Sequence, residues 1–132
     1  MIRVLFDHNM PPALARCLHE AIKIEGHEAC ALRDKFPKNI SDIELYTKIG
    51  KESNWITLSK DVHNAKRKPE KAAILKSGVL AFYLAPTIQR KPITQQAALI
   101  LWHWERMVQQ RLNNRNGLYL LPENKGSKFK LL

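Results

Sequence analysis

Short apolar runs alternate with helical patterns along this chain and predict strands followed by helices. Residues 2–6 form an apolar run typical of a buried strand. Pro11 and Pro12 then favour the start of a helix, because proline suits the first helical turn. The apolar positions of this helix recur at three- and four-residue spacing: Leu14, Cys17, Leu18, Ala21 and Ile22. Gly26 ends the helix, so the chain is predicted to begin with a strand and a helix.

Three further apolar runs predict more strands, at residues 28–32, 55–58 and 79–84. A polar loop follows the first of them, and Ser41-Asp42-Ile43-Glu44 then has the form of a capping box that opens a helix ending near residue 52. Strands that alternate with helices pair in parallel, with right-handed crossovers and helices on both faces. The predicted fold class is therefore α/β, with a mostly parallel central sheet flanked by helices.

The last third of the chain predicts one long amphipathic helix over residues 93–112. Its apolar stripe consists of Ile93, Ala97, Ile100, Leu101, Trp104, Val108 and Leu112. Trp102 and His103 lie off that stripe, where we expect a subunit interface or a stacking platform. Residues 117–121 favour a short final strand, and residues 122–132 form a basic tail. By length, residues 1–132 make one domain, with a core over about 1–112 and a C-terminal strand and tail over 113–132.

Charge and cysteine content narrow the function classes. The formal charge of +10, from 22 Lys and Arg against 12 Asp and Glu, attracts polyanions. RNA or DNA is the leading partner, although an acidic protein or an anionic membrane surface would also satisfy this charge. Cys17 and Cys30 fall in apolar stretches, so we expect reduced core residues and no disulfide framework. The chain shows no signal segment and no run of about 18 apolar residues. We therefore expect a cytoplasmic protein that does not enter a membrane.

Three carboxylates occupy the places where ligands bind in an open parallel sheet. Asp7 follows the first predicted strand, Asp42 opens a helix, and Asp61 lies just beyond the third strand. Side chains at the carboxyl ends of parallel strands, or in the first turns of the following helices, converge on one crevice. Acids gathered there repel one another unless a hard cation such as Mg2+ binds between them. The sequence therefore predicts a metal site.

Each acid also has a purely structural interpretation. Asp7 could form a loop hydrogen bond, although Asn9 is better placed to cap the following helix. Asp42 and Glu44 compete for the second position, because side chains two apart on a helix point roughly 200° away from each other. We favour Asp42, since Glu44 serves the capping box, but an acid in a first helical turn also stabilises the helix without any further function. Asp61 could equally cap the helix beyond it.

Basic residues surround the third acid along the sequence. Lys60, Lys66, Arg67 and Lys68 follow the third strand and would bind the phosphates of a substrate beside the metal. Ser59 and Lys60, at the strand end, could contact water or phosphate. A solvent-exposed helix face is the alternative interpretation of these charges.

In their order and spacing these features resemble the PIN-like superfamily, specifically its compact branch of VapC-type toxins. The likeness covers about residues 1–85. It lies in Leu5-Phe6-Asp7-His8-Asn9-Met10-Pro11-Pro12, in Gly26-His27-Glu28, in Ser41-Asp42-Ile43-Glu44 and in Trp55-Ile56-Thr57-Leu58-Ser59-Lys60-Asp61.

The resemblance implies an endoribonuclease that depends on Mg2+ or Mn2+ and is held inactive by a cognate antitoxin protein. Asp7, Asp42 and Asp61 would then be the catalytic, metal-binding acids, supported by Asn9. Glu44 and Ser59 are further supporting candidates. Ser59 stands where members of the family often have another acid, so the chain lacks a four-carboxylate pattern at these positions.

Two other functions stay open at this stage. A non-catalytic module that binds nucleic acid or a protein partner would use the charge while its acids only cap helices. A phosphatase with an aspartate nucleophile is less favoured, because Asp7-His8-Asn9 lacks the second acid that would protonate the leaving group. A symmetric homodimer is the expected assembly, since such dimers are common.

Overall fold

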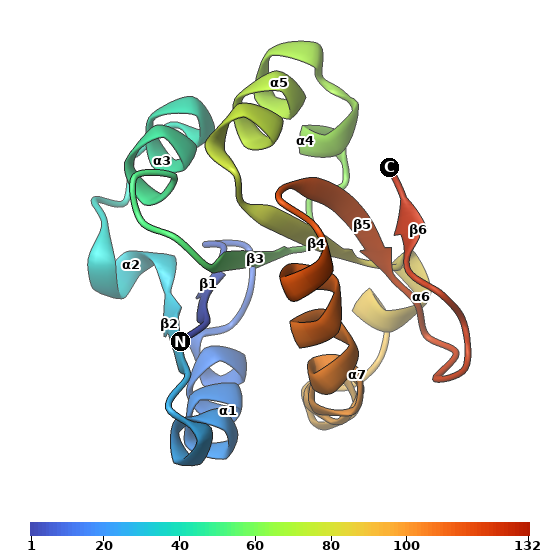
Figure 1. Cartoon of the computed structure of the whole chain (residues 1–132). Helices are drawn as coiled ribbons and strands as arrows, with labels where there is room; N and C mark the ends of the chain where they lie inside the picture. Colours follow the sequence, from blue (N-terminus) through green and yellow to red (C-terminus); the bar gives the residue numbers. More distant parts are fainter.

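The computed structural model describes residues 1–132 except the side chain of Asn64. Its strands form one six-stranded sheet in the order β2-β1-β3-β4-β5-β6 (Figure 1). The first five are parallel, and the last pairs antiparallel with β5. The strands are β1 (Arg3–Phe6), β2 (Glu28–Ala31), β3 (Trp55–Ser59), β4 (Leu80–Leu84), β5 (Gly117–Leu121) and β6 (Lys130–Leu131). The predicted α/β class with a mostly parallel sheet is confirmed.

Helices cover both faces of the sheet (Figure 1). They are α1 (Pro12–Ile22), the 3-10 turn η1 (Lys23–Glu25), α2 (Leu32–Lys35), α3 (Asp42–Ile49), α4 (His63–Lys66), α5 (Lys68–Ser77), α6 (Pro86–Gln89) and α7 (Ile93–Asn113). The buried side chains of α1, α6 and α7 share one apolar cluster with one face of the strands. Those of α2, α3, α4 and α5 share a second cluster with the opposite face. No helix in the described part of the chain is both long and apolar enough to cross a membrane.

The connection from β4 to β5 has the opposite hand from the other three crossovers. β2 lies on one side of β1, whereas β3, β4 and β5 follow in order on the other side. The crossover through α1 lies on one face, and those through α3 and through α5 lie on the other face. The last crossover again moves away from β1, yet α7 lies on the face of α1. The expectation that every crossover is right-handed is therefore wrong. The reason is that α7 buries Leu99, Ile100, Trp104 and Met107 in the same apolar cluster as α1. The predicted apolar stripe of this helix is wrong in part, because Ile93, Leu101 and Leu112 are exposed.

Burial on both faces explains why the strands appear in the sequence as unbroken apolar runs. Every residue of β3 and of β4 is buried. In α1 the buried positions are Leu14, Ala15, Leu18 and Ile22, which places Cys17 on the outer side, where it is exposed. Cys30 is half-buried, and both thiols are free. The prediction that Cys17 is a core residue is therefore wrong.

The C-terminal segment is packed against α7. His103 is completely buried, and its Nε2 donates a hydrogen bond to the carbonyl of Pro122 at 2.9 Å. The Arg106 guanidinium donates to the carbonyl of Ser127. The expectation that His103 lies on an exposed surface is therefore wrong, whereas Trp102 is 56% exposed, as its position off the stripe predicts. These bonds tie residues 122–127 to the long helix.

Arg111, near the end of α7, connects three parts of the fold beneath the sheet. Its side chain is 8% exposed and donates to the carbonyls of Trp55 at 3.0 Å and Gly78 at 2.8 Å. It also donates to the carbonyls of Asn114 at 3.0 Å and Arg115 at 2.7 Å. Burial lowers its pKa. One guanidinium thus holds the start of β3, the segment entering β4 and the turn that ends α7.

Candidate active site

The sheet order places a crevice at the carboxyl ends of β1 and β3. From β1 the chain proceeds to β2 on one side and returns to β3 on the other, which makes the β1–β3 boundary the switch point where α/β proteins bind ligands. Phe6 and Leu58 are register partners at this end. The next residues, Asp7 and Ser59, therefore meet there.

The Ser59 hydroxyl is the centre of a hydrogen-bond network between the two strand ends. It donates to Asp7 Oδ2 at 3.0 Å and accepts from Asn9 Nδ2 at 3.2 Å and from the backbone N–H of Asp61 at 3.1 Å. Asn9 Oδ1 accepts from the backbone N–H of Lys60 at 3.2 Å. Because Ser59 is only 3% exposed, these bonds fix the loops after β1 and β3 to each other.

Asp7 and Asn9 are both used by this network. The second carboxylate oxygen of Asp7, Oδ1, accepts from the backbone N–H of His8 at 2.8 Å and lies 2.9 Å from His8 Nδ1. Asn9 does not cap the following helix: the cap position of α1 is Pro11, which makes no side-chain cap bond. The interpretation of Asn9 as a helix cap is wrong, because its amide is committed to the strand end of β3.

Asp42 is the first residue of α3 and is half-buried. The predicted N-cap is confirmed, since Ser41 Oγ accepts from the N–H of Glu44 at 3.2 Å. The Glu44 carboxylate is exposed and lies 3.4 Å from Lys48 Nζ. Burial raises the pKa of the Asp42 carboxyl, and the charges of Asp7 and Asp61 raise it further, while that of His8 lowers it. Asp42 therefore shares one electrostatic environment with the other two predicted acids.

Asp61 combines a local structural role with a place near the crevice. Its Oδ1 accepts from the backbone N–H of His63 at 3.0 Å and so stabilises the turn that opens α4. The N-cap position of α4 is Val62, which makes no side-chain cap bond, so the interpretation of Asp61 as the cap of this helix is wrong. The negative charge of Asp61 also raises the pKa of Asp42.

The sequence reasoning missed an acid and a buried polar layer. Glu70, in the first turn of α5, is half-buried, and its charge also raises the pKa of Asp42. Tyr46 Oη lies 3.1 Å from Thr57 Oγ1, and burial raises the pKa of Tyr46, with further contributions from Asp7 and Asp42. Tyr46 lies four residues after Asp42, one helical turn further along α3, and this spacing was the available signal.

A second tyrosine belongs to this layer. The hydroxyl of Tyr83, in β4, is buried and has no hydrogen-bond partner among the described residues. Burial raises its pKa, and the neighbouring carboxylates of Asp42 and Asp7 raise it further. Neutral, protonated tyrosines therefore lie in the core near the acids.

The donor groups fit a hard divalent cation. Carboxylate, hydroxyl and amide oxygens suit Mg2+ or Mn2+. Burial raises the pKa of Asp42 and the charges of Asp7 and Asp61 raise it further, and a bound cation would offset both effects. Within the described residues, no group of three or more His, Cys, Asp or Glu side chains is assembled closely enough to hold a metal ion. Mg2+ is compatible with this arrangement, because it is commonly bound by one or two carboxylates, with water and substrate phosphate completing its shell.

Residues 2–86 match the family described as PIN like domain. The chain belongs to this PIN-like family. No curated protein and no solved structure matches it at a significant level. The resemblance at the level of the superfamily is confirmed, and the matched segment contains the network around Ser59 and the three predicted acids. PIN-like domains are commonly nucleases, a class of hydrolases.

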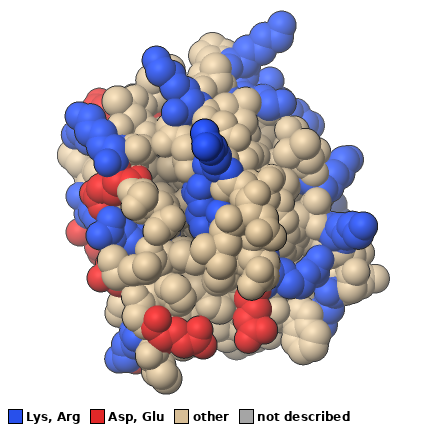
Figure 2. Space-filling view, in the orientation of Figure 1, with Lys and Arg blue, Asp and Glu red and all other residues tan. Residues whose placement is uncertain are grey.

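The four basic residues predicted to bind substrate lie on the segment of this PIN-like domain that follows the site. Lys60 is half-buried next to Ser59. Lys66, Arg67 and Lys68 are exposed at the junction of α4 and α5. Figure 2 shows Lys and Arg spread over much of one face, with Asp and Glu nearer its left and lower edges.

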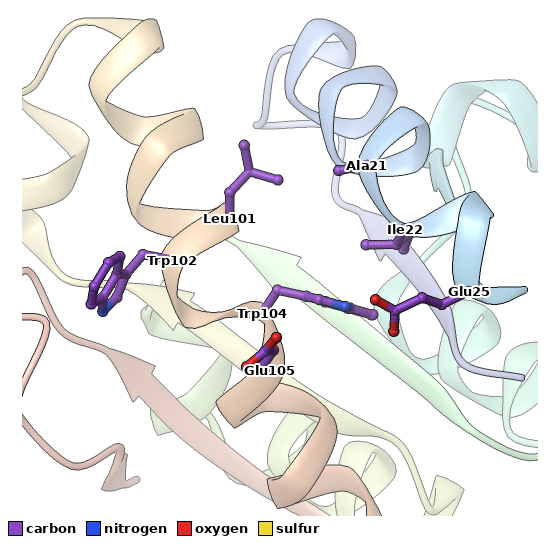
Figure 3. A pocket seen from close by; sticks show the side chains of 7 residues that line it. All are labelled: Ala21, Ile22, Glu25, Leu101, Trp102, Trp104 and Glu105. Atoms are coloured by element: carbon purple, nitrogen blue, oxygen red, sulfur yellow. The ribbon is translucent and has the colours of Figure 1, made fainter.

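A separate hollow of about 380 Å³ lies between the end of α1 and α7, on the opposite face of the PIN-like domain from α3 and α5 (Figure 3). Leu101 and Trp104 point toward α1, whereas Trp102 points away from it. Glu25 and Glu105 contribute negative charge to its lining. Its lining includes none of the predicted site residues, so it is not part of the crevice at the strand ends.

Proposed function

We propose that this PIN-like domain is a metal-dependent endoribonuclease that hydrolyses RNA phosphodiesters in the cytoplasm. We further propose that it is the toxin of a VapC-type pair and is inhibited by a cognate antitoxin protein. One observation carries the proposal: Asp7, Asp42 and Asp61 come from three separate segments, and the pKa of Asp42 is raised by burial and further by the charges of Asp7 and Asp61. Perturbed carboxyls in the crevice of an α/β sheet are a signature of functional sites.

Asp7, Asp42 and Asp61 are the residues that would hold Mg2+ or Mn2+. When bound, such an ion lowers the pKa of water and polarises a phosphoryl oxygen. Glu70 adds a fourth negative charge from α5, which compensates in part for the hydroxyl at position 59.

The remaining site residues position these acids and the substrate. Ser59 orients the Asp7 carboxylate by donating to Oδ2, and Asn9 holds the two loops together. Lys66, Arg67 and Lys68 are exposed beside the site and would bind phosphates of the RNA backbone. The net charge of +10 adds long-range attraction for a polyanion.

Cleavage of a mixed RNA pool by the purified protein tests the proposal. We expect cleavage with Mg2+ or Mn2+, none with EDTA, and a loss of at least about 100-fold in Asp7→Asn and Asp42→Asn, the range typical of lost electrostatic catalytic groups. Glu44→Gln is the matched control, because Glu44 opens the same helix but pairs with Lys48. Equal activity of Asp42→Asn and Glu44→Gln would contradict the assigned site.

A non-catalytic nucleic-acid or partner-binding module is the second candidate. It is favoured by the structural hydrogen bonds of Asp7 and Asp61 and by the lack of an assembled three-ligand cluster among the described side chains. Such a module would bind RNA in EDTA with strong salt dependence and would not cleave it with any divalent ion.

A further inference from the structure

A groove separates α3 from α5 on the face of the sheet opposite α1. Its volume is about 420 Å³. The lining residues recur at helical spacing on the facing sides of the two helices: Ile43, Thr47, Gly50, Lys51, Ala73 and Lys76. Figure 1 shows α3 and α5 next to each other above the sheet.

One end of the groove lies at the start of α3, the helix that begins with Asp42, although no acid lines the groove itself. Ile43 directly follows Asp42 and is 49% exposed, although it is a large apolar side chain. At the other end the two helices come into close contact, because a Cβ on Gly50 would lie 2.8 Å from the carbonyl oxygen of Ser77. From Ile43 to Gly50 the helical rise spans ~10 Å. The groove thus extends away from the acid site and is closed at its far end.

Positive charge borders this groove. Lys51 and Lys76 line it, and neither forms an ion pair within the part of the chain that the structure describes. The hollow between α1 and α7 is lined instead by Glu25 and Glu105. Of these two apolar hollows, only the one between α3 and α5 has a charge that complements a polyanion.

We propose that the groove between α3 and α5 binds one nucleotide of a single-stranded RNA next to the scissile phosphodiester. The base lies against Ile43 and Ala73, and the backbone phosphates on the side away from the acids are bound by Lys51 and Lys76. Proteins that bind single strands combine a positively charged groove for the backbone with side chains that contact the faces of the bases. Aromatic side chains usually provide that contact, and here the apolar side chains of Ile43 and Ala73 would do so. This inference rests on the proposed function, since it takes RNA as the substrate of the adjacent acids.

Binding of a fluorescein-labelled single-stranded RNA in EDTA, followed by anisotropy at several salt concentrations, tests the groove without any cleavage. The first variant is Lys51→Glu with Lys76→Glu. Its matched control is Lys38→Glu with Lys128→Glu, which changes the charge equally at two exposed positions outside the groove. The uncharged variant is Ile43→Ser.

We expect the groove variant to bind at least about 10-fold more weakly than the control, with a log–log salt slope smaller by about 1.4, because each lost single-strand phosphate contact removes ~0.7. Ile43→Ser should weaken binding about 5-fold and leave the salt slope unchanged, since it removes base contact only. Equal weakening by both double variants, unchanged binding by Ile43→Ser, or no RNA binding by the wild-type protein would overturn the inference.

Cleavage measured in parallel with Mg2+ separates this inference from the proposed function. Groove-dependent binding without cleavage would reject the nuclease and keep the nucleotide site. Metal-dependent cleavage in which the groove variant matches its control would reject the nucleotide site and keep the nuclease. Circular dichroism melting of each variant shows whether the fold is intact.

Discussion

Replacing Ser59 with alanine tests the network on which the candidate site depends. The hydroxyl donates to one carboxylate oxygen of Asp7 and accepts from Asn9 and from the N–H of Asp61. Alanine keeps the β-strand backbone and removes all three bonds at a position that is 3% exposed. The backbone bond from the N–H of Asp7 to the carbonyl of Leu58 and the bond from the N–H of Lys60 to Asn9 Oδ1 would remain.

The expected loss of stability follows from the kinds of bond removed. A hydrogen bond to an ionised carboxylate contributes ~1.5–3 kcal/mol, and a neutral one ~0.5–1.5 kcal/mol. Asp7, Asn9 and Asp61 are half-buried, so water replaces part of what they lose. We therefore expect the free energy of unfolding to fall by about 2–3 kcal/mol. For 132 residues this corresponds to a decrease in Tm of about 7–11 °C.

Urea unfolding in EDTA, followed by circular dichroism, measures this loss. Ser53→Ala is the control, because Ser53 is exposed in a loop before β3, and it should stay within about 0.5 kcal/mol of wild type. A Ser59→Ala protein that is also within that range would refute the reasoning. Ser59→Asp should be less stable than Ser59→Ala in EDTA, because it adds a charge that repels Asp7, and Mg2+ should restore part of the difference.

Three further predictions concern buried charge. Asp42→Asn should be more stable than wild type at pH 7 in EDTA. Burial and Asp7 raise the pKa of Asp42 above 3.8, so its ionised form is disfavoured in the folded state. The free energies of unfolding of the two proteins should converge as the pH falls below 3.8. Burial lowers the pKa of His103 below 6.5, and the charges of Arg106 and Lys125 lower it further, so the free energy of unfolding should fall as the pH drops below 6.5. His103→Gln should weaken this pH dependence when unfolding is measured at several pH values. Arg111→Leu leaves four backbone carbonyls without the guanidinium donors. The free energy of unfolding measured by urea titration should fall by about 3–5 kcal/mol, and Arg111→Lys should be intermediate. An effect below about 1 kcal/mol would contradict the role assigned to Arg111.

Most helices and strands of the fold could be predicted from local sequence patterns. The strands could be predicted because a parallel strand buried on both faces needs an unbroken apolar run, as Trp55 to Ser59 shows. The start of α3 could be predicted because Ser41 and its helix-capping bond are local. Its end could not: the predicted helix reaches residue 52, but α3 stops at Ile49, and Gly50 lies where Ser77 leaves no room for a side chain. The four-residue helices α2 and α6 were missed, because tertiary burial of Leu32 and Ile88 favours them more than sequence propensity does.

The sequence indicated which residues make up the candidate site, but it did not indicate the hydrogen bonds between them. Asp7 could be located because it directly follows a strand. The role of Ser59 could not, since a hydroxyl selects its partners from neighbours that only the sheet order brings together. Asn9 looked like a helix cap for the same reason: its sequence neighbours offered a local partner, while its actual partners, Ser59 and Lys60, lie about fifty residues away.

The position of α7 separates the length of the family signature from the length of the folding unit. Residues 2–86 carry the match, but Ile100, Trp104 and Met107 of α7 are in the same apolar cluster as Phe6 of β1. A fragment ending at residue 86 would therefore leave much of one sheet face open to water, and we expect it to aggregate rather than fold. The segment that identifies the family is thus shorter than the segment that we expect to fold. Residues 87–132 belong to the smallest unit that we expect to be stable.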